Sequence, residues 1–175
     1  MNGKLVGVII VVSALVAGAA LYYLQIYAFY EEVASVEGAD VQLVARETNE
    51  PEPIPYAEFA AIDADSSPIR YRACFITPMG LDRLTEDFLP VMDATPRNAP
   101  GWFECFDASA IAAELEAGTA RAYLGQKNIA YGVDRIVAVT ADGRGFVWHE
   151  LNECGDKTYD GTVVGEECPP ATEAD

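Results

Sequence analysis

The stretch RIVAVTADGRGFVWHEL, residues 135–151, decides the fold class of this chain. Two runs rich in β-branched and aromatic residues, 135–140 and 145–151, flank Ala141-Asp142-Gly143-Arg144. Glycine after aspartate supplies the positive φ that a tight hairpin turn needs, so the stretch predicts two neighbouring antiparallel strands.

Further strands and two short helices are predicted before this hairpin. The runs 69–76, 121–124 and 129–131 have strand character, and apolar residues at helical spacing cover 81–89. Asp107 and Gly118 suit the two ends of a second helix, 108–117. Strands beside two helices, without alternating βαβ units, predict an α+β domain with an antiparallel sheet. We expect its core to include Phe75, Ile76, Leu84, Phe88, Ile111, Leu115, Ile136, Val137, Val139 and Val147.

A membrane-spanning helix is predicted at the N-terminus. The sequence LVGVIIVVSALVAGAALYYL, residues 5–24, carries no charge. Twenty residues at about 1.5 Å each span about 30 Å, the thickness of the bilayer hydrocarbon. Apolar character continues to Tyr30, and five aromatic residues gather at this end, where such rings favour the headgroup layer. We therefore assign 5–30 to a transmembrane helix and its aromatic interface.

Charges beside the span predict its orientation. Lys4 precedes the span, whereas Glu31 and Glu32 follow it, which places residues 1–4 in the cytoplasm and the remainder outside. A cleaved signal peptide is the alternative, because Ala17-Gly18-Ala19 resembles a peptidase site. The apolar run continues for about eleven residues past that point, which favours an uncleaved anchor.

Small residues recur along one side of the predicted span. Such residues let another helix approach closely, so this face is a candidate helix-packing surface. A lipid-facing helix that is rich in small residues is the alternative. The positions are Gly3, Gly7, Ala14 and Gly18.

The chain after the span divides into two predicted parts. Residues 31–55 are acidic and contain Pro51, Pro53 and Pro55, which is typical of an extended stalk, although 41–44 could form a short strand. The folded domain is expected to cover 56–175.

Four cysteines, Cys74, Cys105, Cys154 and Cys168, follow the span. An even number in an oxidising compartment predicts two disulfides, with three pairings open. We favour Cys74–Cys105 and Cys154–Cys168, because the second pair would hold the glycine-containing tail on the domain.

No catalytic, metal or cofactor motif stands out. His149 is the chain's one histidine, and a structural role for it is favoured because no partner for a general base is identifiable. Asp63 and Asp65 alternate as in a calcium loop, but Pro68 stands where that loop needs glycine, so a polar turn is favoured. We expect a non-enzymatic protein without cofactor or metal. Trp102, Trp148 and His149 form the candidate ligand or partner surface.

The charge balance excludes nucleic-acid binding as a function class. The chain has 11 basic and 28 acidic residues, for a net charge of −17. Phosphate recognition depends on clustered Lys and Arg, which this composition lacks. An acidic field could instead steer a basic partner protein, with a merely solubilising surface as the alternative.

Several separated segments recur together in the order found in one family. They are MNGKLVGVIIVVSALVAGAALYYLQIYAFYEEV, IDADSSPIRYRACF, APGWFECFDA, LGQKNIAYGVDR and DGRGFVWHELNECG. In these segments the chain resembles a family of small single-span proteins of unknown function from alphaproteobacteria. The resemblance implies a Gram-negative inner membrane and a periplasmic domain, and it brings no catalytic residues.

These observations favour a non-enzymatic accessory or assembly subunit of an inner-membrane complex, with a respiratory complex as one candidate. Its helix would pack against an integral membrane partner, and its acidic domain would face the periplasm. The alternative is a membrane-anchored periplasmic sensor or ligand-binding module, with a pocket near Trp102, Trp148 and His149. An anchored hydrolase is a third hypothesis, and it requires a nucleophile beside His149.

Overall fold

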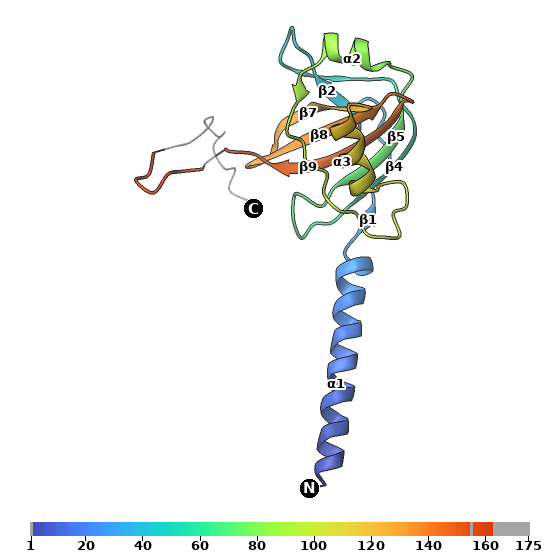
Figure 1. The fold of residues 1–175 in the computed structure, drawn as a ribbon, viewed down its shortest axis with the longest axis vertical. Helices are drawn as coiled ribbons and strands as arrows, with labels where there is room; N and C mark the ends of the chain where they lie inside the picture. Colours follow the sequence, from blue (N-terminus) through green and yellow to red (C-terminus); the bar gives the residue numbers. More distant parts are fainter. Residues whose placement is uncertain (1, 155, 163–175) are drawn as a thin grey trace.

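A long N-terminal helix leads directly into a sheet domain (Figure 1). The structure is a computed structural model that describes residues 2–154 and 156–162. Helix α1, Gly3–Tyr23, continues as a π-helical turn, η1, Leu24–Ala28. Together they form one helix long and apolar enough to cross a membrane, with a mean hydropathy of 2.5 and no buried residues. Such a helix near the N-terminus fits either a membrane anchor or a signal sequence.

Within the described residues, the main sheet has seven strands, and every neighbouring pair is antiparallel. In spatial order they are β1 (Glu31–Glu32), β4 (Ala57–Asp63), β5 (Arg72–Ile76), β9 (Arg144–Leu151), β8 (Val133–Thr140), β7 (Ala120–Ala130) and β6 (Pro90–Val91). A separate hairpin consists of β2 (Gln42–Val44) and β3 (Pro51–Pro53). The predicted hairpin is β8–β9, with Gly143 at φ 86° in its turn. The α+β class is confirmed.

The two predicted helices are present. Helix α2 covers Leu81–Asp87, and α3 covers Ala108–Ala117. The Asp107 carboxylate accepts hydrogen bonds from the backbone N–H groups of Ser109 and Ala110, and Gly118 ends α3 at φ 72°. Both ends of α3 therefore follow the capping chemistry expected from the sequence.

The sheet carries a buried apolar cluster on each face. One cluster includes Leu43, Phe75 and Val147, and the β2–β3 hairpin and α2 contribute to it. The other includes Phe106, Ile111 and Trp148, and it is covered by α3 and the loop before it. Because strand residues alternate between faces, Val147 and Trp148 belong to different clusters.

Three details of the predicted core and strands differ in the structure. Ile76 is 38% exposed, because it is the last residue of β5 and pairs with Arg144 beside the turn of the β8–β9 hairpin. Leu115 is only partly buried, whereas the other eight predicted core residues are buried. The runs 121–124 and 129–131 belong to one strand, β7, which is interrupted by register shifts.

The predicted stalk over 31–55 is wrong for most of its length. Val41 and Leu43 are fully buried in the main cluster, and Ile54 is 4% exposed. Glu31 and Glu32 already pair with β4. Pro51 and Pro53 lie in β3 instead of an extended linker, since they pair with Val44 and Gln42 of β2. The folded domain therefore begins at the end of the helix.

Candidate functional site

The structure does not bring together the three residues of the predicted ligand surface. Trp148 is fully buried, and its ring contacts Phe106 edge to face at a centroid distance of 6.3 Å. His149 is 6% exposed and lies on the opposite face of the sheet, where it stacks on Tyr71. Trp102 contacts the end of the N-terminal helix. The pocket required by the ligand-binding hypothesis therefore has no support from these positions.

His149 uses both of its ring nitrogens in contacts with the protein. Nδ1 lies 2.6 Å from the carbonyl oxygen of Pro68, and Nε2 accepts a hydrogen bond of 3.1 Å from Nε of Arg135. A neutral ring with its proton on Nδ1 satisfies both contacts. Burial, together with the nearby positive charge of Arg135, lowers the pKa of His149 to about 4. A general base here would first have to break one of these bonds.

Tyr71 lies between two charged or polar partners in this cluster. Its ring stacks on His149 at a centroid distance of 4.9 Å, and the Arg135 guanidinium lies 4.6 Å from its centroid. Burial raises the pKa of Tyr71 to about 12, so the phenol stays protonated at neutral pH. The three side chains connect β8 and β9 with the residue directly before β5, which is a structural role.

Cys74 and Cys105 form a disulfide, as expected, with their Cα atoms 6.3 Å apart. The bridge ties the loop before α3 to β5. Arg72 holds the same loop by donating to the carbonyl oxygens of Arg97 at 2.8 Å and Asn98 at 3.0 Å. In the second predicted pair, Cys154–Cys168, Cys168 lies outside the described residues.

The remaining predicted positions have a simpler environment. The Asp63 carboxylate accepts the backbone N–H of Ala64 at 2.8 Å, as in a polar turn. No group of three His, Cys, Asp or Glu in the described part of the chain could hold a metal ion.

The predicted helix-packing face on α1 is exposed. Side chains added at Gly3, Gly7 or Gly18 would meet no atom within 4 Å. This helix face is thus open, and its packing against another helix stays a prediction.

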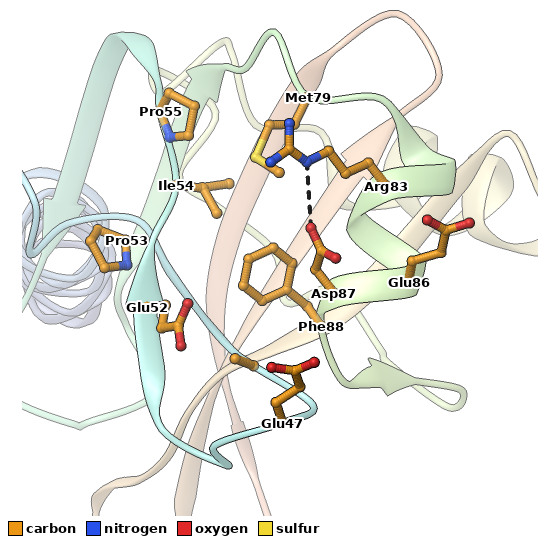
Figure 2. A pocket seen from close by; sticks show the side chains of 11 residues that line it. Glu47, Glu52, Pro53, Ile54, Pro55, Met79, Arg83, Glu86, Asp87 and Phe88 are labelled. Carbon is orange, nitrogen blue, oxygen red and sulfur yellow. Dashed lines mark hydrogen bonds and ion pairs between the residues drawn. The ribbon is translucent and has the colours of Figure 1, made fainter.

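A groove of about 430 Å³ lies between β3 and α2 (Figure 2). Its lining consists of Ala45, Glu47, Glu52, Pro53, Ile54, Pro55, Met79, Arg83, Glu86, Asp87 and Phe88. Ile54 and Phe88 are 4% and 6% exposed, and their side chains lie between the two walls as the apolar floor. The exposed lining residues are mostly charged.

Carboxylates dominate the charge of the groove. Four acidic residues and one basic residue line it, which leaves a formal charge of −3. Arg83 is engaged with Asp87 through an Nε to Oδ2 contact of 3.4 Å, and both side chains are largely exposed. The carboxylates of Glu47, Glu52 and Glu86 make no ion pair within the described residues. The groove is therefore suited to an occupant with basic and apolar parts.

Backbone hydrogen bonds fix the two walls of the groove relative to each other. The N–H of Arg46 donates to the carbonyl of Asp87 at 2.9 Å, and Ala45 forms a β-bridge with Phe88. The Arg46 side chain donates through Nε to the carbonyl of Thr85 at 3.1 Å. Pro51 and Pro53 have no N–H, so β3 cannot donate to an additional strand at these positions. The groove is thus a preformed surface with a protected edge.

The groove was missed in the sequence because its acidic wall was assigned to a stalk. The available signal was the alternation of Val41, Leu43 and Ala45, which is typical of a half-buried strand. In the structure, α2 and the β2–β3 hairpin lie at the end of the domain away from α1 (Figure 1). The groove therefore lies at the end of the domain away from any membrane that α1 crosses.

Comparison with known proteins identifies the family but no characterised relative. Neither the curated proteins nor the solved structures contain a significant match. A model of a family of unknown function, DUF6446, matches residues 41–169. The matched region includes the strands of the groove and the disulfide, and it begins inside the segment predicted as a stalk. The match covers most of the chain, which therefore belongs to the DUF6446 family of unknown function.

Proposed function

We propose that this protein is a membrane-anchored, non-enzymatic accessory subunit that presents its acidic groove to a basic segment of a partner protein. The observation that carries the proposal is the groove itself: an apolar floor beneath unbalanced carboxylates, at the end of the domain away from α1. Helix α1 serves as the anchor, and the partner belongs to a complex of the inner membrane.

Two features support a periplasmic position for the domain. Disulfides persist in oxidising compartments, and the Cys74–Cys105 bridge lies within the domain. Lys4 precedes the span, whereas acidic residues follow it, which favours a cytoplasmic N-terminus. Both features are consistent with an uncleaved anchor in a Gram-negative inner membrane.

The chemistry of the groove favours a basic occupant. Ten basic and 28 acidic residues follow Lys4, so the chain beyond it carries a formal charge of −18. This field attracts basic segments over a distance of about 8 Å at physiological ionic strength. Inside the groove, the alkyl stems of lysine or arginine can pack on Ile54 and Phe88 while their charged ends meet Glu47 and Glu52.

The helix offers a second contact with the same complex. Gly3, Gly7, Ala14 and Gly18 leave an open helix surface on which a neighbouring transmembrane helix can pack closely. Attachment through the helix and recognition through the groove would act together, because the anchor raises the effective concentration of the groove near its partner.

Affinity purification of the full-length protein in mild detergent tests the groove. Glu47→Lys/Glu52→Lys should lose a partner that co-purifies with the wild type. Asp93→Lys/Glu116→Lys is the matched control, because it makes the same change in net charge at exposed positions outside the groove. The control should retain the partner, and higher salt should weaken binding of the wild type.

The outcomes separate the groove from the global charge. Equal loss in both variants would mean that net charge, not the groove, recruits the partner. Full retention in Glu47→Lys/Glu52→Lys would contradict the proposed groove contact outright. A wild-type protein that purifies as a lone monomer would remove the support for an accessory role.

A further inference from the structure

We propose that the loop 99–104, with Trp102 at its centre, rests in the lipid headgroup layer beside the exit of helix α1. We call this loop the foot of the domain. It lies at the end of the domain next to the helix, opposite α2 (Figure 1). The partner of this surface is the membrane itself, and the inference does not depend on the groove.

Trp102 contacts the last turn of the helix. Its indole Nε1 donates a hydrogen bond of 2.8 Å to the carbonyl oxygen of Ile26. Its ring also meets the ring of Tyr30 edge to face, at a centroid distance of 6.1 Å and an angle of 80°. The guanidinium of Arg70 lies 5.6 Å from the centroid of the Tyr30 ring. The depth of Ile26 in the membrane therefore also determines the depth of Trp102.

The length of the helix places Ile26 at the membrane surface. The apolar helix has 26 residues, Gly3–Ala28. At about 1.5 Å each it is about 39 Å long, against about 30 Å for the hydrocarbon layer. The uncharged stretch 5–24 fills the hydrocarbon, so Ile26 lies just beyond it. Tryptophan is enriched at this level because its ring is apolar and its N–H is polar.

The short connection between the helix and the sheet restricts how far the foot can move away from the membrane. The π-helical turn ends at Ala28, and β1 begins at Glu31. Glu31 and Glu32 pair with Asp63 and Ile62 of β4, and the Val33 N–H then donates to the carbonyl of Ala61 at 2.9 Å. Only two residues separate the helix from the sheet.

The foot has its own internal support. Arg72 donates to the carbonyl oxygens of Arg97 and Asn98 on one side of the loop, and the Cys74–Cys105 bridge holds the other side. The loop is also closed by a hydrogen bond of 2.9 Å from the N–H of Phe103 to the carbonyl of Pro100. The loop thus keeps its shape without the bilayer.

Aromatic groups, not charge, make the lipid contact. Arg70 and Arg97 near the foot are offset by the exposed Glu31, Glu32 and Glu104. Trp102 and Phe103 are partly buried, and their rings contact each other at a centroid distance of 6.3 Å. Zwitterionic phosphatidylcholine should therefore suffice as the lipid partner.

Quenching of tryptophan fluorescence by brominated lipid tests the foot. The chain has two tryptophans, and Trp148 is fully buried in the core of the domain, so it serves as an internal control. Full-length protein is reconstituted into vesicles of phosphatidylcholine that is brominated on its acyl chains near the headgroup. The wild type should lose a large part of its emission relative to unbrominated vesicles. Trp102→Phe should lose almost none.

A second variant and a wash make each outcome decisive. Trp148→Phe retains Trp102 alone and should show the strongest fractional quenching, although the difference between wild type and Trp102→Phe is sufficient if this core variant fails to fold. Equal, weak quenching of wild type and Trp102→Phe, in protein that resists an alkaline wash, would overturn the foot and leave the span intact. Protein removed by the wash would overturn both. Neither result bears on partner binding by the groove.

Discussion

Arg135 donates a hydrogen bond through Nε to Nε2 of His149, across the paired strands β8 and β9. The distance is 3.1 Å, and the imidazole lies in a site where His149 is only 6% exposed. Protonation of Nε2 would turn an acceptor into a donor that faces another N–H group. The fold therefore holds His149 in its neutral form.

We expect the burial of His149, together with this contact, to make the domain less stable in mild acid. The native pKa of His149 is about 4, below its ordinary value of 6.5, so the unfolded chain takes up the proton first as the pH falls. The contribution of His149 should be constant above about pH 6.5 and should be lost progressively toward pH 4, by up to about 3 kcal/mol. Denaturant unfolding at several pH values measures this.

His149→Gln is the control for that measurement, because glutamine can retain a donor and an acceptor without titrating. Its free energy of unfolding should depend less on pH than that of the wild type between about pH 6.5 and 4. The comparison of slopes is needed because burial raises the pKa values of Asp63 and Glu150, which also titrate in acid. If the free energy of unfolding had the same pH dependence in the wild type and in His149→Gln, His149 would not be the source of the acid sensitivity.

The disulfide should contribute a large share of the stability. Cys74 and Cys105 are 31 residues apart in sequence, and the loop-entropy relation gives about 3 to 4 kcal/mol for a closed loop of this length. Cys74→Ala/Cys105→Ala should lower the free energy of unfolding by this amount. Denaturant unfolding of the wild type and of the double variant measures it. An unchanged midpoint in the double variant would contradict this expectation.

Leu43→Ala tests whether 41–55 belongs to the domain. Leu43 is fully buried in the main cluster, so its truncation should lower the free energy of unfolding by about 2 to 5 kcal/mol. Val36→Ala is the matched control, since Val36 is 58% exposed and should change stability by less than about 0.5 kcal/mol. Thermal or denaturant unfolding distinguishes them. If both variants changed the free energy of unfolding by similarly small amounts, residues 41–55 would be an extended stalk and not part of the domain.

Gly145 is expected to tolerate no side chain. It pairs with Phe75 of β5, and a Cβ atom at residue 145 would collide with the Phe75 ring, which is 2% exposed. Gly145→Ala should therefore cost about 1 to 3 kcal/mol. In the background Phe75→Leu the same change should cost less, and a double-mutant cycle measures the difference. Additive effects would mean that the ring does not cause the penalty.

The parts of the fold that could be predicted from the sequence depend on short-range patterns. The span follows from an uncharged apolar run, and β8–β9 follows from β-branched runs around Asp142-Gly143. Helix α3 has the expected bounds because its capping groups, Asp107 and Gly118, act within one turn. Alternation along β9 puts Trp148 and His149 on opposite faces of the sheet, but it does not show that both are buried.

The groove depended on contacts that no local pattern contains. Its walls come from 45–55 and 79–88, and they meet through the bridge between Ala45 and Phe88. The acidic residues before Pro51 have the composition of a linker, and only the burial of Leu43 beneath the sheet shows otherwise. Composition reports the average polarity of a segment, whereas tertiary packing depends on which side of each strand is apolar.

The sequence by itself determined a membrane-length helix, an α+β domain and the Cys74–Cys105 bridge as the favoured pairing. The tertiary structure alone decided that the domain starts directly after the helix, that Trp102 lies against Ile26 and that the acidic groove lies at the end of the domain away from the anchor. The physical reason is the separation in sequence over which each kind of interaction acts. Helix capping, turns and hydrophobic runs act between neighbours, whereas these three features join segments that only the completed sheet brings together.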